Sequence, residues 1–174
     1  GELQHAGYNL SDKARMQYFQ GQPLTDLWPD LEKYLKFLRK TQSQISTDSV
    51  LGLQLIIRNL MGQTADKFQF HLEELDDAQY QEQSRAHRSF YILVHYLIFK
   101  AQVLYLYGAL DEALACILSA KQSFSVIPST TDLATFNFYY SLILAALYPT
   151  AVPETQTEYW SQLEANQKQM KSWA

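Results

Sequence analysis

The stretch of sequence that decides the fold is Ala101-Gln102-Val103-Leu104-Tyr105-Leu106-Tyr107-Gly108-Ala109-Leu110-Asp111-Glu112-Ala113-Leu114. A mostly apolar run leads up to Gly108, and two acids come just after it, before a second apolar run. Glycine can take the left-handed conformation that ends a helix, and acids are favoured where the next helix begins. We therefore expect two helices, at about 85–107 and from 109 to about 124, joined by a tight turn.

Glycine and proline mark further helix ends along the chain. Gly21 and Gly62 each follow a helix-like run, and Pro149 and Pro153 interrupt another. The chain has no Asn-Gly, Asp-Gly or Gly-Gly pair, so the strongest sequence sign of a β-hairpin is missing. The sequence therefore predicts an all-α fold, an antiparallel array of helical hairpins with about seven helices.

The remaining helices are expected at about 2–20, 24–42, 47–61, 131–148 and 154–174, with a short one near 76–83. Pro29 leaves two starts open for the second helix, residue 24 or residues 28–29, because proline is tolerated near the first turn. Thr47 or Ser49 would cap the third helix, and Thr131 would cap the one at 131–148.

The composition of the 174-residue chain fits one globular domain. Hydrophobic residues make up 47% and charged residues only 18%, which excludes disorder. The single cysteine, Cys116, excludes a disulfide framework and fits a reducing compartment, and the net charge of −4 argues against a nucleic-acid binder. The N-terminus lacks the basic and apolar regions of a signal peptide, so we expect a cytoplasmic protein.

The ends of the chain suggest a larger protein. It begins at Gly1 and keeps a helical pattern to Ala174, so we expect residues 1–174 to be a single helical, repeat-like domain cut from a multidomain chain.

Charge is scarce in one part of the chain. Between Ser89 and Pro153 the charged residues are Lys100, Asp111, Glu112, Lys121 and Asp132. The apolar run at 90–107 contains His95, Lys100 and Gln102, which fits a helix buried in protein better than one that spans a membrane. Two explanations stay open: the other helices cover these apolar faces, or a Tyr/Phe face packs on a partner. The candidate contacts for a partner are Tyr105, Tyr107, Tyr139 and Tyr140.

The stretch around Gly108 resembles a tetratricopeptide repeat. In that repeat small residues let two helices approach closely, and glycine allows the turn between them. The residues that carry the resemblance are Ala101, Gly108, Leu110, Glu112, Ala113, Leu114 and Ala120. An exact period of about 34 residues is absent, so the expected array is a degenerate one.

Several blocks of sequence together resemble a narrower family. The blocks are Gly1-Glu2 with Ala6-Gly7-Tyr8, Phe19-Gln20-Gly21-Gln22-Pro23-Leu24, Tyr107-Gly108 with Glu112-Ala113-Leu114, Phe136-Asn137-Phe138-Tyr139-Tyr140-Ser141-Leu142-Ile143-Leu144-Ala145-Ala146-Leu147-Tyr148-Pro149, and Trp160 with Glu164-Ala165-Asn166-Gln167-Lys168-Gln169-Met170-Lys171-Ser172-Trp173-Ala174. The chain is similar to the helical middle region of very large, mostly cyanobacterial, multi-sensor signalling kinases. The resemblance implies a serine/threonine kinase domain, an ATPase domain, a GAF sensor and a histidine kinase elsewhere in the same protein.

The chain itself shows no sequence motif for catalysis or for a cofactor. It contains no glycine-rich phosphate loop and no kinase catalytic motif. His71, His87 and His95 are too widely spaced for a zinc site, so we expect neither a metal nor a cofactor. The acids at 73–77 and the basic edge formed by Lys33, Lys36, Arg39 and Lys40 are interpreted first as solvated surface.

We therefore expect a non-catalytic helical scaffold and protein-interaction module of a bacterial signalling kinase. Its partners would be neighbouring domains of the same chain, a second copy of this chain, or a separate protein or peptide, with no nucleic acid and no membrane span. The alternative is a small-molecule sensor pocket lined by Tyr and Phe between helices. An enzyme of unrecognised type is the third hypothesis.

Overall fold

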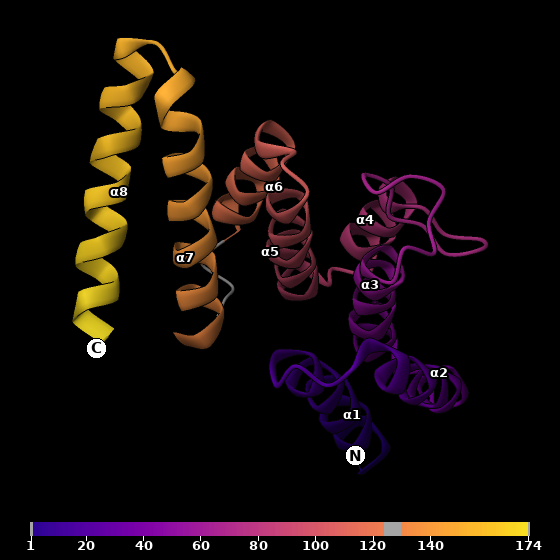
Figure 1. Cartoon of the computed structure of the whole chain (residues 1–174). Helices are drawn as coiled ribbons and strands as arrows, with labels where there is room; N and C mark the ends of the chain where they lie inside the picture. Colours follow the sequence, from indigo (N-terminus) through magenta and orange to yellow (C-terminus); the bar gives the residue numbers. More distant parts are fainter. Residues whose placement is uncertain (1, 124–129, 174) are drawn as a thin grey trace. The chain divides into compact units, whose positions relative to one another are not determined.

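The computed structural model describes residues 2–123 and 130–173, and this part of the chain is helical (Figure 1). Its helices are α1 (Glu2–Phe19), α2 (Leu24–Lys40), α3 (Gln44–Leu60), α4 (Asp77–Ala86), α5 (Phe90–Leu106), α6 (Leu110–Gln122), α7 (Thr130–Leu147), the 3-10 helix η2 (Tyr148–Thr150) and α8 (Pro153–Trp173). Strand-like pairing in the described residues amounts to an isolated bridge between His71 and Asp76. The prediction of an all-α fold is confirmed for these residues.

Left-handed residues end several helices. The backbone at Gly108 has φ of 79°, and its neighbours close the turn, since Ala109 N donates to Leu104 O at 2.9 Å. Gly21 and Gly62 also have positive φ, so the three expected glycine helix ends are confirmed.

The predicted start of the helix at about 85–107 is wrong, because the helical conformation is interrupted at Arg88. Arg88 has φ of 58°, and Ser89 N donates to Ser84 O at 2.8 Å, which ends α4 at Ala86. The next helix, α5, then starts at Phe90. An arginine rather than a glycine occupies the left-handed position, so the sequence carries no sign of this helix end.

Two other helix starts are fixed by the structure. Of the two starts left open for α2, Leu24 is the observed one, and Pro29 lies inside the helix. The expected caps of the third helix are wrong, because α3 begins at Gln44 and Thr47 is buried within it. The side chain of Thr131, expected as a cap, lies outside the described residues.

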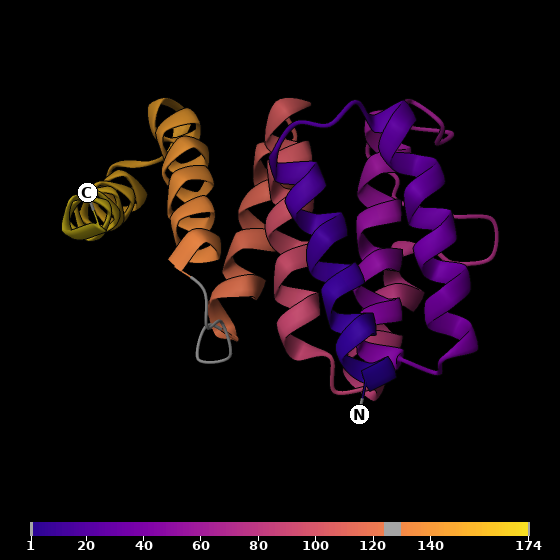
Figure 2. The ribbon, with the colours of Figure 1, turned by 90° about the horizontal axis from the view of Figure 1, so that it is seen from below.

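The chain divides into two compact units, Gly1–Tyr96 and Leu97–Ala174, with the boundary inside α5. In the first unit α1 packs against both α2 and α3, α2 packs along α3, and α4 also lies on α3. Figure 2 shows α1, α2 and α3 side by side. Because three helices cover α3, most of its residues are buried, among them Val50, Leu55 and Ile56.

In the second unit α7 packs against both α6 and α8. The buried residues of α7 include Phe136, Ile143 and Leu144, whereas Asn166 is the buried residue of α8. The described helices include none that is long and apolar enough to cross a membrane.

Candidate functional site

The residues that resemble a repeat turn lie where α5 meets α6. Ala101, Ala113 and Ala120 are fully buried, which is what a close approach of helices requires. Gly108 and Glu112 are exposed, and Leu110 and Leu114 are half-buried.

Three aromatic residues of the second unit form a partly exposed cluster that we call the aromatic face: Tyr105, Phe138 and Tyr139. The Tyr105 and Tyr139 rings meet edge to face with centroids 6.2 Å apart, and Phe138 lies 5.3 Å from Tyr139. The Phe138 side chain is 47% exposed. Burial, and next the neighbouring Tyr105, raises the pKa of Tyr139 above its usual value. Tyr139 therefore stays neutral near pH 7.

The other two candidate tyrosines differ in exposure. Tyr107 is half-buried near the end of α5. Tyr140 is buried, with the Lys121 ammonium 5.4 Å above its ring and the Phe136 ring 5.5 Å away. Burial raises the pKa of Tyr140. Tyr140 is thus part of the core of the second unit, and the partly exposed candidates are Tyr105, Tyr107 and Tyr139.

A chain of polar contacts joins α6, α7 and α8 beside Tyr140. Lys121 Nζ donates to Gln162 Oε1 at 2.9 Å, and Gln162 Nε2 donates to Asn166 Oδ1 at 2.7 Å. Asn166 Nδ2 then donates to Ser141 Oγ at 3.2 Å, and Ser141 donates to the carbonyl of Asn137. The buried asparagine of α8 therefore bonds both to α7 and to its own helix.

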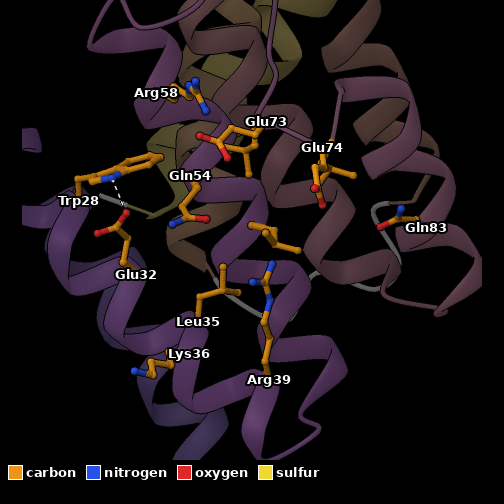
Figure 3. A pocket seen from close by; sticks show the side chains of 13 residues that line it. Trp28, Glu32, Leu35, Lys36, Arg39, Gln54, Arg58, Glu73, Glu74 and Gln83 are labelled. Carbon is orange, nitrogen blue, oxygen red and sulfur yellow. Dashed lines mark hydrogen bonds between the residues drawn. The ribbon is translucent and has the colours of Figure 1, made fainter.

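The largest groove that we describe lies in the first unit, and we call it the α2–α3 groove (Figure 3). It has a volume of about 740 Å³. Its lining comes from α2, α3, the segment before α4, and α4 itself: Trp28, Glu32, Leu35, Lys36, Arg39, Leu51, Gln54, Arg58, Leu72, Glu73, Glu74, Leu75 and Gln83.

The groove is lined by charges of both signs. Figure 3 shows Lys36 and Arg39 toward one end, and Arg58, Glu73 and Glu74 toward the other. Trp28 Nε1 donates to Glu32 Oε1 at 3.2 Å, which holds the indole at the edge of the groove. Gln54 lies between the two ends and is only 4% exposed.

Asp48 is the most connected buried acid of the first unit. Its carboxylate accepts hydrogen bonds from Gln44 Nε2 at 2.8 Å and from Ser89 Oγ at 2.7 Å, and it lies 3.0 Å from His87 Nδ1. An Asp–His–Ser set with nucleophilic chemistry needs the serine to donate to the histidine. Here the serine donates to the aspartate, so the three residues tie the turn between α4 and α5 to α3.

Two smaller grooves also lie in the first unit. One of about 560 Å³ is lined by residues 65–78 and includes Phe68, Phe70 and His71. The other, of about 480 Å³, lies between the start of α1 and the α2–α3 turn and includes Tyr8. None of the three grooves is lined by Tyr or Phe from two helices. Among the residues that the structure describes, no three His, Cys, Asp or Glu side chains come together to hold a metal ion.

Comparisons with protein-family models, with curated proteins and with solved structures found no match to this chain. Any inference about function therefore rests on the surfaces and contacts of the chain itself.

Two features of the first unit were missed from the sequence. The basic edge of α2 and the acids at 73–77 were interpreted as separate solvated surfaces, but Lys36, Arg39, Glu73 and Glu74 line one groove. Gln54, in an otherwise apolar stretch of α3, is the signal that could have marked it.

Proposed function

We propose that this chain is a non-catalytic helical scaffold and protein-interaction module that couples the sensor and kinase domains of a bacterial multidomain signalling kinase. The observation that carries the interaction role is the aromatic face, where Tyr105 and Phe138 each meet Tyr139 edge to face while Phe138 stays 47% exposed. The kinase context rests on the sequence resemblance alone.

The packing of the first unit supports a degenerate tetratricopeptide-like array. In stacked helical pairs, the first helix of one pair packs on both helices of the pair before it. Here α3 packs on both α1 and α2. The tight turn at Gly108, flanked by buried Ala101 and Ala113, is the second supporting feature.

The aromatic face suits a protein partner because Tyr and Phe are enriched at the centres of interfaces and charge is depleted there. The stretch Ser89–Pro153 has both properties. We assign as its occupant a neighbouring domain of the same protein. A second copy of this chain and a separate protein are the other outcomes that the experiment distinguishes.

The test is made in the multidomain protein that this proposal implies. Phe138→Ser with Tyr139→Ser is expected to lower signal-dependent phosphorylation roughly tenfold, which corresponds to the loss of about 1.4 kcal/mol of contact energy. Trp160→Ser, which removes a large exposed aromatic side chain from α8, is the control and leaves phosphorylation unchanged. Equal phosphorylation in all three proteins would contradict the proposal.

Light scattering of residues 1–174 identifies the occupant. If a neighbouring domain covers the aromatic face, the isolated chain forms at most a weak dimer, and domain contacts are recovered by cross-linking in the longer protein. A stable dimer that Phe138→Ser dissociates would assign the face to a second copy instead.

A further inference from the structure

A long ordered loop, residues 61–76, joins α3 to α4 (Figure 1). Loops of more than about 12–15 residues without a helix or strand of their own are uncommon in compact units, and ordered ones usually carry a function. Asn59, a buried residue of α3, holds this loop in place, because its Nδ2 donates to the carbonyls of Lys67 and Gln69 at 2.9 and 2.7 Å. The side chain of Phe70 is 3% exposed and fixes the loop in the core.

The loop and the first turn of α4 line the groove of about 560 Å³, which we call the loop groove. Part of its lining is apolar and includes Phe68, Phe70 and Ala78. The backbone N–H of Phe68 donates to Asp66 Oδ1 at 2.7 Å, yet the side chain of Phe68 stays 46% exposed. The fold therefore holds an aromatic ring partly in solvent at this groove.

The charges in the lining of the loop groove are both negative. Asp76 and Asp77 line it, and they stand at the start of α4. The positive end of a helix dipole is equivalent to about half an elementary charge, so it offsets only part of these two carboxylates. His71 is the other titratable residue of the lining.

The surroundings of the loop groove are also acidic. Residues 61–77 contain five acids and one base, Lys67, so their net charge is −4. Arg58 of α3, which lies beside Glu73 and Glu74 (Figure 3), offsets one of these negative charges. The surplus that remains attracts a cationic ligand.

The ring of Phe68 already holds a cation. The Lys67 ammonium lies 4.9 Å from the centroid of that ring. A cation above an aromatic ring is attracted by the electron density of its face. A guanidinium is planar, stacks on aromatic rings and is more weakly hydrated than an ammonium, so an arginine side chain suits this ring better than Lys67 does.

Of the two acids in the groove, Asp76 is the one that has room for a ligand. Its Oδ1 accepts from Gln79 N at 2.8 Å and so caps α4. Asp77 Oδ1, in contrast, accepts from both Tyr96 and Gln81, at 2.6 and 3.0 Å. A carboxylate has about four acceptor sites, so Asp76 can cap the helix and accept from a guanidinium at the same time.

We propose that the loop groove binds a segment of a partner protein through one arginine side chain. The guanidinium stacks on Phe68 in place of the Lys67 ammonium and donates to the carboxylate of Asp76. An apolar residue next to that arginine packs against Phe70 and Ala78. This site lies in the first unit, is separate from the aromatic face, and goes beyond the scaffold role.

The test uses residues 1–174 and three pools of blocked heptapeptides. The central position is arginine, lysine or citrulline, and the flanking positions vary among alanine, valine and leucine. Citrulline has nearly the shape of arginine but no charge. Binding is followed by the amide NMR shifts of residues 65–78. We expect the arginine pool to shift them, the lysine pool to bind about threefold more weakly, and the citrulline pool to leave them unchanged.

Substitutions in the groove separate recognition from a structural role. Asp76→Asn removes the charge but keeps a good helix cap, and it is expected to weaken binding of the arginine pool about tenfold. Glu82→Gln, which removes the same charge from α4 outside the groove, is the matched control and leaves binding unchanged. Lys67→Met frees the ring of Phe68 and is expected to strengthen binding about threefold.

Three results would overturn this proposal. They are no shift of residues 65–78 with the arginine pool, equal binding of the arginine and citrulline pools, or unchanged binding by Asp76→Asn. The protein with Phe138→Ser and Tyr139→Ser is expected to bind the arginine pool normally, so a failure here and a failure of the scaffold role are told apart.

Discussion

At Asp48 a single buried carboxylate holds two segments together, α3 and the turn between α4 and α5. It is 3% exposed and accepts from Gln44 in its own helix and from Ser89 before α5, while His87 lies beside it. Hydrogen bonds to a charged group contribute roughly 1.5–3 kcal/mol. Asp48→Asn turns one acceptor into a donor that faces other donors. We expect the free energy of unfolding, measured with urea, to fall by about 2 kcal/mol.

The control for Asp48→Asn is Glu82→Gln, which removes a negative charge from an exposed position on α4. Exposed substitutions of this kind change stability by less than about 0.5 kcal/mol. If the two substitutions had equal effects, the loss would come from net charge and not from the contacts of Asp48.

Tyr80 makes the stability of the first unit decrease at alkaline pH. It is buried against Tyr96 and donates to the carbonyl of Asp48 at 2.9 Å. Burial raises its pKa above the usual value of 10.0. The folded state therefore keeps the phenol proton at a pH where the unfolded state has released it, so stability present below about pH 10 is lost as the pH rises further.

We predict that the urea concentration at the unfolding midpoint of the natural chain decreases as the pH is raised from roughly 9 to roughly 11. The decrease is expected to be less steep in Tyr80→Phe. Tyr139 and Tyr140 also have raised pKa values, so some dependence remains in the variant. Identical slopes in the two proteins would show that Tyr80 does not carry the effect.

Among the helices, α8 depends most on one residue. Most of its residues are exposed, and Asn166 is the side chain that it buries against α7. We expect Asn166→Ala to weaken the attachment of α8 by about 1–2 kcal/mol, because two hydrogen bonds and a buried contact are lost. Trypsin should then cut faster at Lys168 and Lys171, about tenfold for each 1.4 kcal/mol. Gln167→Ala, at the exposed next position, should leave the rate unchanged.

The helices could be predicted from the sequence wherever their ends depend on local chemistry. Gly108 could be placed because glycine is the residue that most readily takes a left-handed backbone. The break at Arg88 could not, since its left-handed conformation follows from the contacts that hold Ser89 to Asp48, 41 residues away. A contact across that distance in sequence leaves no local pattern.

The same limit applies to the candidate sites. The sequence identified the aromatic residues of α5 and α7 as a group, but it could not say that Tyr140 is buried and that Tyr139 is half-exposed, because that depends on where α6 and α8 lie. The α2–α3 groove was missed for a similar reason: the residues that line it come from segments that meet only after α3 is packed.

At the scale of the whole molecule, the division into two compact units predicts that a substitution in one unit changes hydrogen exchange in that unit alone. Asp48 makes its contacts within Gly1–Tyr96, and Asn166 makes its contacts within Leu97–Ala174. Local openings occur in cooperative segments, so a substitution speeds hydrogen exchange mainly in the segment that it destabilises. We expect Asp48→Asn to speed amide exchange in α3 more than tenfold and to leave α7 unchanged, and Asn166→Ala to do the reverse. Mass spectrometry of peptides from Gln44–Leu60 and Thr130–Leu147 measures both. If each substitution sped exchange equally in both helices, the chain would open as one cooperative body, and the boundary inside α5 would have no energetic meaning.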